Sequence, residues 1–100
     1  MPYRIEYSPE AEDHLRALTA RQRAIVLDTG DEQLLHQPTV ETQQRKPMRP
    51  NPIAPYELRI GTLRVYYYDV EEEPELVVNI RAVGIKIRSQ VRIGKEIVDL

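Results

Sequence analysis

Residues 56–86 contain three runs in which apolar and polar side chains alternate, and this pattern constrains the fold more than any other feature of the chain. Alternation with a period of two is typical of strands that bury one face. Only Gly61-Thr62 separates the first two runs, and this pair suits a tight hairpin turn, which would make Arg59 and Arg64 cross-strand neighbours. We expect the last strand to end at Gly84. The pattern therefore predicts three antiparallel strands, at about 56–60, 63–69 and 76–83.

The first 37 residues predict one strand and two helices. Residues 2–7 alternate in the manner of a half-buried strand. The Ser8-Pro9 pair that follows suits a helix N-terminus, because a serine hydroxyl can cap the first turn and proline needs no partner for its missing N–H group. Helical spacing then places three apolar residues on one face of the first helix, namely Ala11, Leu15 and Leu18.

A second helix is expected directly after the first. Thr19-Ala20-Arg21-Gln22 has the form of a capping box, and Gln37-Pro38 should end the helix. Gly30 inside this helix should cost about 1 kcal/mol relative to alanine. We expect its inward-facing residues to be Ala20, Ala24, Leu27 and Leu34.

Residues 38–55 hold five of the eight prolines, which predicts an irregular, mostly extended loop rather than a linker between domains. Beyond the last strand, Gly94-Lys95 suits the turn of a short C-terminal hairpin. The element order predicts an α+β fold of one domain over residues 1–100, with a two-helix hairpin covering one face of an antiparallel sheet.

Alternation assigns the strand residues to two faces of the sheet. Toward the helices we expect Leu58, Ile60, Leu63, Val65, Tyr67, Leu76, Val78 and Ile80. On the opposite face we expect Glu57, Arg59, Arg64, Tyr66, Tyr68, Asn79 and Arg81.

Composition narrows the kind of site. The chain has no cysteine, which excludes disulfides and thiolate metal sites, and it shows no zinc-ligand spacing, phosphate-binding glycine loop or serine triad. We therefore expect neither a metal nor a cofactor. No apolar run approaches the roughly 18 residues that a membrane span needs, so we expect a cytoplasmic protein with no membrane partner.

Charge is divided unevenly along the chain, although the net charge is only −2. Residues 1–37 carry four Arg against seven Asp and Glu, whereas residues 38–70 and 76–95 together carry ten Lys and Arg against three acids. A polyanionic partner is therefore expected to contact the second half of the chain.

Four segments together carry a resemblance to a known family. They are the N-terminal strand followed by SPEAEDHL, the segment KPM, the hairpin YELRIGTLRVYY and the strand end RAVGIK. Over roughly residues 3–88 the chain resembles the RelE/ParE superfamily of bacterial type II toxins, which share a helical hairpin packed on a small antiparallel sheet. The resemblance implies a cognate antitoxin as partner and, in the ribonuclease branch, mRNA on the ribosome as substrate.

In that branch basic residues surround the scissile phosphate, and the resemblance assigns these roles to Arg59, Arg64 and Lys86. Such cleavage needs no metal, because an RNA 2′-hydroxyl aligned with its phosphate reacts when cations stabilise the charge on the phosphoryl oxygens. Arg64 is the best candidate, since its planar fork can hold two oxygens. Glu57 is a possible general base, with the simpler alternative that it only balances a neighbouring arginine.

Further candidates for substrate binding are loop and sheet cations and two tyrosines that suit stacking on unpaired bases. The simpler alternative for each is a surface or packing role, and Tyr67 should point inward. We expect both histidines to lie on the surface. The substrate-binding candidates are Arg45, Lys46, Arg49, Arg81, Tyr66 and Tyr68.

Two functions stay open at this point. Many nucleases of the family carry a Tyr or His near the C-terminus, and this chain has neither after Tyr68. The gyrase-inhibiting branch lacks such a catalytic set and acts by binding a protein. The alternative to a nuclease is therefore a non-enzymatic toxin, or a chain that only binds an antitoxin.

Overall fold

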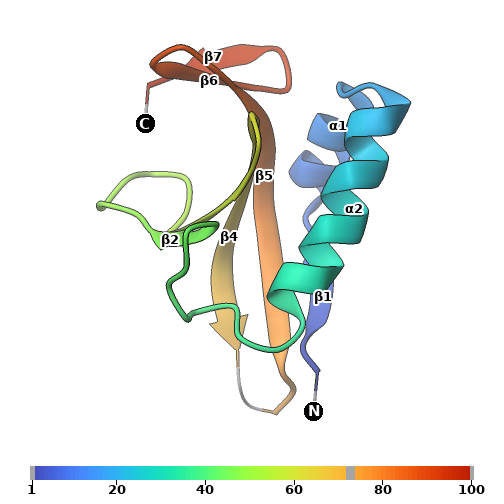
Figure 1. The fold of residues 1–100 in the computed structure, drawn as a ribbon, viewed down its shortest axis with the longest axis vertical. Coiled ribbons are helices and arrows are strands. Elements are labelled where there is room, and N and C mark those ends of the chain that lie inside the picture. Colours follow the sequence, from blue (N-terminus) through green and yellow to red (C-terminus); the bar gives the residue numbers. More distant parts are fainter. Residues whose placement is uncertain (1, 72–73, 100) are drawn as a thin grey trace.

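The computed structural model describes residues 2–71 and 74–99, with only the backbone described for 68–71, and they form two helices and a seven-stranded sheet (Figure 1). The helices lie on one side of the sheet, as the α+β expectation requires. In chain order the elements are β1 (Arg4–Tyr7), α1 (Pro9–Arg16), α2 (Ala20–Leu34), β2 (Arg45–Pro47), β3 (Tyr56–Ile60), β4 (Leu63–Glu71), β5 (Val77–Ile87), β6 (Gln90–Ile93) and β7 (Glu96–Val98).

Both helices begin at the caps that the sequence predicts. The Ser8 hydroxyl accepts a hydrogen bond from the N–H group of Ala11 at 3.1 Å, and Pro9 occupies the first turn of α1. In α2 the Thr19 hydroxyl accepts from the Gln22 N–H group at 3.1 Å, while the Gln22 side chain accepts from the Thr19 N–H group at 3.0 Å. These bonds satisfy N–H groups that would otherwise lack a partner in the first turn.

The sheet is arranged around the long strand β5. Its order is β2-β3-β4-β5-β6-β7, with antiparallel neighbours throughout. β4 occupies one edge of β5, so the other edge is shared: β1 pairs there in parallel with 77–80, and β6 pairs with 84–87. The expected end of this strand at Gly84 is therefore wrong, because β6 continues to pair with β5 up to Ile87.

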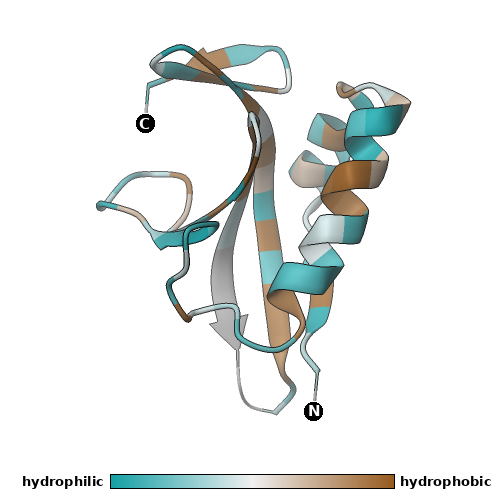
Figure 2. Cartoon of the chain, viewed as in Figure 1, coloured by the Kyte–Doolittle hydropathy of each residue, from teal (hydrophilic) through white to brown (hydrophobic). Residues whose placement is uncertain are grey.

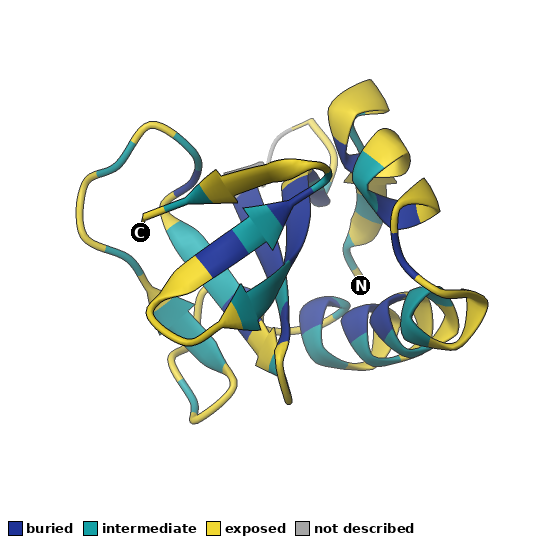
Figure 3. Cartoon of the chain, turned by 90° about the horizontal axis from the view of Figure 1, so that it is seen from above, coloured by how far each residue is buried: buried dark blue, intermediate teal, exposed yellow. Residues whose placement is uncertain are grey.

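The main core lies between the helices and the sheet, where buried residues of both layers meet (Figure 3). Hydropathy alternates along β5, as expected for a strand with two different faces (Figure 2). Of the residues expected on this face, Leu76 is outside the core cluster and Ile60 is only partly buried. The strand residues buried in this core are Leu58, Leu63, Val65, Tyr67, Val78, Ile80 and Val83.

The buried face of α2 differs from the predicted one, because the helix is rotated about its axis relative to the expectation. Val26, Gly30 and Leu34 are the buried residues, and their spacing of four positions defines the inward face. Leu34 was expected there, but Ala20, Ala24 and Leu27 are exposed. The helix also ends at Leu34, three residues before Gln37.

A second, smaller core covers the opposite face of the sheet. It comprises Ala54, Tyr66, Ala82, Val91 and Ile93, with Met48, Ile53 and Val98 packed against them. The cover has two sources, namely the proline-rich segment and the C-terminal hairpin of β6 and β7. The hairpin confirms the turn expected at Gly94, whose φ is +63°.

The proline-rich segment is more ordered than a loop. Arg45–Pro47 forms the edge strand β2, which pairs with β3, so the expectation of a loop is wrong for these three residues. Proline is tolerated there because an edge strand need not donate every N–H group. The Asn51 side chain then ties the next turn together, donating to the carbonyl oxygens of Arg49 and Ala54 at 2.7 and 2.9 Å.

Within the described part of the chain, neither helix has both the length and the hydropathy needed to cross a membrane.

Candidate functional site

A groove of about 640 Å³ opens on the face of the sheet that the helices leave uncovered. β3 and β5 contribute Glu57, Arg59 and Lys86 to its surface. One wall is the proline-rich segment from Pro47 to Pro52, and the other is the C-terminal hairpin with Val91, Val98 and Asp99. Three predicted site residues, two from β3 and one from β5, thus line one depression, whereas Arg64 is not among its lining residues.

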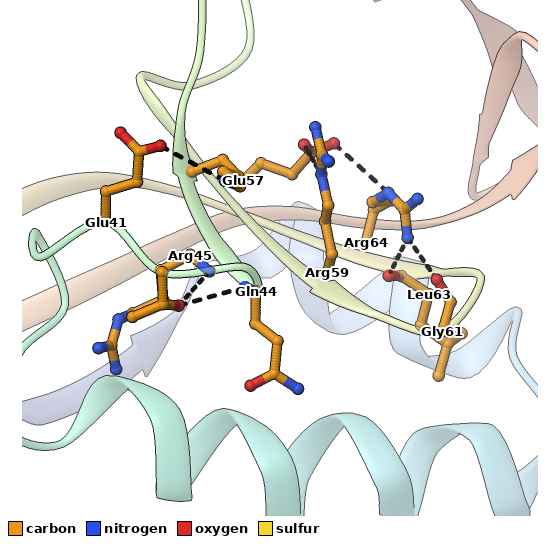
Figure 4. A network of polar contacts seen from close by, with 10 residues as sticks. Glu41, Gln44, Arg45, Glu57, Arg59, Gly61, Leu63 and Arg64 are labelled. Atoms are coloured by element: carbon orange, nitrogen blue, oxygen red, sulfur yellow. Dashed lines mark hydrogen bonds and ion pairs between the residues drawn. The ribbon is translucent and has the colours of Figure 1, made fainter.

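Glu57 joins two arginines on this face (Figure 4). Its Oε2 lies 2.9 Å from Arg59 Nε, and its Oε1 lies 3.5 Å from Arg64 Nε. The exposed fraction is 12% for the Glu57 side chain and 13% for Arg64, against 49% for Arg59. The Glu57–Arg64 pair is therefore largely removed from water, whereas Arg59 extends into the groove.

Arg64 is held in a fixed orientation by the hairpin turn. Its Nη1 donates to the carbonyl oxygens of Gly61 and Leu63, at 2.7 and 2.9 Å. The φ of Gly61 is +59°, a conformation that suits glycine in this turn. Arg64 lies on the expected face, but it is mostly shielded from solvent, because these bonds fold its side chain back onto the turn.

Strand pairing explains why these groups come together. Arg59 is the direct cross-strand partner of Arg64, and Arg64 in turn is paired with Gly84 on β5. A Cβ atom at Gly84 would lie 2.7 Å from both the Arg92 carbonyl oxygen and Val91 Cγ1. The missing side chain therefore lets β6 close over β5 next to the arginines, and Lys86 follows two positions later on the same face.

The other loop cations are divided between the two faces. Arg49 is exposed and lines the groove. Lys46 is paired with Glu57 across β2 and β3, and its Nζ lies 3.4 Å from Glu41 Oε2. Both therefore lie on the same face as the arginine pair.

Arg45 lies on the helix side instead (Figure 4). Its Nη1 donates to the Gln33 carbonyl oxygen at 2.7 Å, and its Nε donates to the Val40 carbonyl oxygen at 2.9 Å. These bonds attach the end of α2 to the edge of the sheet. The structure does not bring Arg45 together with the groove cations.

Tyr66 lies on the expected face but is not accessible to a base. The residue has an exposed fraction of 0%, because the proline-rich segment and the C-terminal hairpin cover its ring. Tyr66 is the cross-strand partner of Glu57. Burial, reinforced by the charge of Glu57, raises the pKa of the Tyr66 hydroxyl well above its usual value. The side chain of Tyr68 lies outside the part that the structure describes.

Arg81 belongs to a different depression. It is the extra residue at a register shift between β4 and β5, since Tyr67 pairs with Ile80 and Tyr66 pairs with Ala82. Arg81 lines a depression of about 850 Å³ between α1 and the C-terminal hairpin, together with Asp13 and His14 of the helix. Arg81 and Arg59 therefore line two different depressions.

His14 was expected on the surface, but it is only partly exposed. Its Nδ1 accepts a hydrogen bond from the Val83 N–H group at 3.3 Å, which connects α1 to β5. Burial lowers the pKa of His14, while the charges of Asp13, Glu10 and Glu96 oppose this effect.

The C-terminal hairpin is the part of the site that sequence reasoning missed. Its Val91 and Val98 form a wall of the groove, although the short hairpin predicted there was given no part in the site. The available signal was the alternation of Val91 and Ile93, which are both buried. No group of three or more His, Cys, Asp or Glu side chains in the described residues is placed to hold a metal ion.

The chain matches known proteins at the level of solved structures. No protein-family model matches the chain, and no curated protein matches it either. Among solved structures it is similar to a chain of the toxin–antitoxin complex RelBE2 from Mycobacterium tuberculosis, with a TM-score of 0.72 and 26% sequence identity. The match covers 86% of this chain and 100% of the other.

Proposed function

The structural match supports placing this chain in the RelE-like toxin superfamily, and we propose that it is the toxin of a type II toxin–antitoxin pair. Its partner is then a cognate antitoxin protein. An acidic, initially disordered antitoxin segment suits the cationic loop and sheet, because opposite charge favours encounter. Co-expression with the neighbouring small reading frame, followed by affinity purification, should recover both chains.

The proposed activity is metal-independent cleavage of mRNA. The observation that carries this proposal is the placement of Arg59, Arg64 and Glu57 in contact beside Lys86. Two arginines paired with one carboxylate, and Lys86 in the lining of the same groove, provide the positive charge that a phosphodiester needs, and the carboxylate is a group that can take a proton. The groove also lies on the sheet face without helices, where a single strand of RNA has access.

In the proposed reaction the 2′-oxygen of one nucleotide attacks the adjacent phosphorus. The O2′–P bond forms while the bond from phosphorus to the 5′-oxygen of the next nucleotide breaks, which leaves a cyclic phosphate. Glu57 takes the proton of the 2′-hydroxyl, and water protonates the leaving oxygen. Each proton and electron pair is thus accounted for without a metal.

The cations have separate roles in this proposal. Since Nη1 of Arg64 is held by the turn, its Nε and Nη2 form the edge that can take two phosphoryl oxygens. Arg59 and Lys86 add charge that stabilises the transition state. Lys46 and Arg49 contact flanking phosphates, which fix the position of the strand. Arg45 and Tyr66 are not part of this binding surface.

A protein-binding toxin is the second candidate. Two observations favour it: the chain has no Tyr or His after Tyr68, and Glu57 already neutralises two arginines in the free protein. Such a toxin would stop growth without cutting RNA.

Transcript mapping after induction separates the two candidates. Cells that express the chain without its antitoxin should stop growing, and new 5′ ends should appear within coding regions during the first minutes. Growth arrest with unchanged transcript ends would contradict the nuclease and favour the protein-binding toxin. A chain with Arg59 and Arg64 both changed to alanine is the control for nonspecific stress.

A further inference from the structure

Arg59, which lines the groove, and its neighbour Arg64 are already paired with an anion of the chain itself. Each oxygen of Glu57 faces a different arginine, at 2.9 Å from Arg59 Nε and 3.5 Å from Arg64 Nε. A carboxylate and a phosphate bind guanidinium groups in the same way, through paired oxygens. Glu57 thus occupies the position that a phosphate group would need.

The hydroxyl of Tyr66 is a buried hydrogen-bond donor close to this carboxylate. Its oxygen is buried, and no hydrogen bond of ordinary geometry reaches it among the described residues, although the Glu57 carboxylate is near enough to help raise the pKa of the hydroxyl. A buried hydroxyl without a partner is uncommon, because desolvating it costs free energy that no contact returns. The cross-strand partner of Tyr66 is Glu57. Directly opposed residues of antiparallel strands are close enough for their side chains to touch.

We propose that Glu57 is an internal counter-anion that leaves the arginines when a phosphodiester binds, and that the Tyr66 hydroxyl then becomes its hydrogen-bond donor. Tyr66 is accordingly a positioning residue, which holds Glu57 beside the bound phosphate without touching the substrate. This inference rests on the proposed function for the identity of the anion, but the exchange of partners is measurable without any cleavage.

The contacts make Glu57 suited to such an exchange. Its pair with Arg64 is long at 3.5 Å, whereas the two bonds from Arg64 to the turn are made to backbone carbonyl oxygens and do not involve Glu57. Arg64 therefore stays in place when the carboxylate leaves. A bound phosphate supplies the arginines with new negative charge, and Tyr66 supplies Glu57 with the donor that it loses.

The test measures binding of a short RNA whose 2′-hydroxyl groups are all methylated, so that it cannot be cut. Fluorescence anisotropy at constant ionic strength compares wild type with Glu57→Gln, Tyr66→Phe and the double variant. Asp99→Asn is the matched control, because it removes the same charge from the opposite wall of the groove. Inorganic phosphate is the second probe, and it competes with the labelled RNA.

Glu57→Gln should tighten RNA binding about fivefold or more, because hydrogen bonds to an ionised group are roughly twice as strong as neutral ones and the competitor is weakened. Asp99→Asn should change binding less than about twofold, because a single exposed charge across the groove is screened by salt. Phosphate should compete more strongly on Glu57→Gln than on wild type.

Tyr66→Phe should weaken RNA binding about threefold, because the displaced carboxylate then lacks a donor. In the Glu57→Gln background the same change should have no effect. In the free protein Tyr66→Phe should melt at the same temperature as wild type or higher, since the lost hydroxyl has no partner. A merely structural role for Tyr66 would instead lower the melting temperature in both backgrounds.

Unchanged or weaker binding by Glu57→Gln would overturn the inference, and so would equal effects of Tyr66→Phe in both backgrounds. Failure of either probe to bind Glu57→Gln would overturn it as well. These outcomes are separate from failure of the proposed nuclease, which shows as uncut transcripts while the binding pattern persists.

Discussion

The hydroxyl of Tyr67 donates a buried hydrogen bond to the carbonyl oxygen of Pro38 at 2.6 Å. This bond fixes the start of the proline-rich segment to the central strand β4. The Tyr67 ring is also stacked on Tyr56, with ring centroids 5.3 Å apart. The segment that forms one wall of the groove is therefore anchored at both the strand β2 and this single hydroxyl.

Tyr67→Phe should destabilise the protein by about 1–3 kcal/mol, because it leaves the buried Pro38 carbonyl without its partner. Urea unfolding followed by circular dichroism measures the change. Tyr56→Phe keeps the stacked ring and is the control. Equal stability of the two variants would show that the Tyr67–Pro38 bond contributes nothing.

The two glycines of the packed core should respond to alanine in opposite directions. At Gly84 a Cβ atom would lie 2.7 Å from a backbone oxygen, so Gly84→Ala should cost about 1–3 kcal/mol through overpacking. At Gly30 the nearest atom is Tyr7 Oη at 3.5 Å, an ordinary contact. Gly30→Ala should therefore stabilise the helix by about 1 kcal/mol. Thermal unfolding measures both changes, and the result for Gly84→Ala tests the packing of β5 against β6.

Stability should fall as the pH drops below about 6.5, the usual pKa of histidine. Burial lowers the pKa of His14 in the folded protein, so the unfolded chain binds protons more readily. The stabilisation is present above the unfolded pKa and is lost as the pH falls through the lower folded value. His14→Gln should flatten this dependence, and His36→Gln, a change at an exposed histidine, is the matched control. A slope that survives His14→Gln would assign it to other groups.

Alanine at Arg45 should lower stability without affecting RNA binding, and alanine at Arg59 should do the opposite. Arg45→Ala removes hydrogen bonds to two carbonyl oxygens and should cost about 1 kcal/mol, without changing affinity for a methylated RNA. Arg59→Ala should shift stability by less than about 0.5 kcal/mol. It should weaken RNA binding and reduce the salt slope by about 1. The reverse pattern would place the binding surface on the helix side.

Local sequence patterns predicted most helices and strands, because alternation and helix caps depend on residues close together in the sequence. Alternation located β3 and β4, and the serine and threonine caps located the starts of both helices. The rotation of α2 could not be read in this way, because its face toward the sheet is set by packing. Val26 and Leu27 are equally apolar neighbours, and only contact with the sheet decides which one is buried.

The site depended more on tertiary structure than the fold did. Strand pairing at a tight hairpin was enough to predict that Arg59 and Arg64 are neighbours. Burial of Tyr66 was not predictable, since the residues that cover it come from segments before β3 and after β5. The helix-side position of Arg45 likewise follows from a strand within a segment whose prolines predicted a loop.

The central claim is that Arg64 stabilises charge on a phosphoryl group. The most direct measurement is the rate of transcript cleavage in a ribosome-containing translation mixture for wild type, Arg64→Ala and Arg64→Lys. Removing one such donor can cost about 2.7–4 kcal/mol, so Arg64→Ala should slow cleavage roughly a hundredfold or more. Arg64→Lys should restore only part of the rate, because it keeps the charge but loses the fork.

Arg64→Ala also loses bonds to the hairpin turn, so each variant is compared at a temperature where circular dichroism shows it folded. Arg45→Ala is the matched control, since it loses an arginine and stability but should cut at the wild-type rate. The account predicts slow cleavage by folded Arg64→Ala alongside normal cleavage by Arg45→Ala. Cleavage by Arg64→Ala as fast as by wild type, or no cleavage by a wild-type chain that arrests growth, would contradict it.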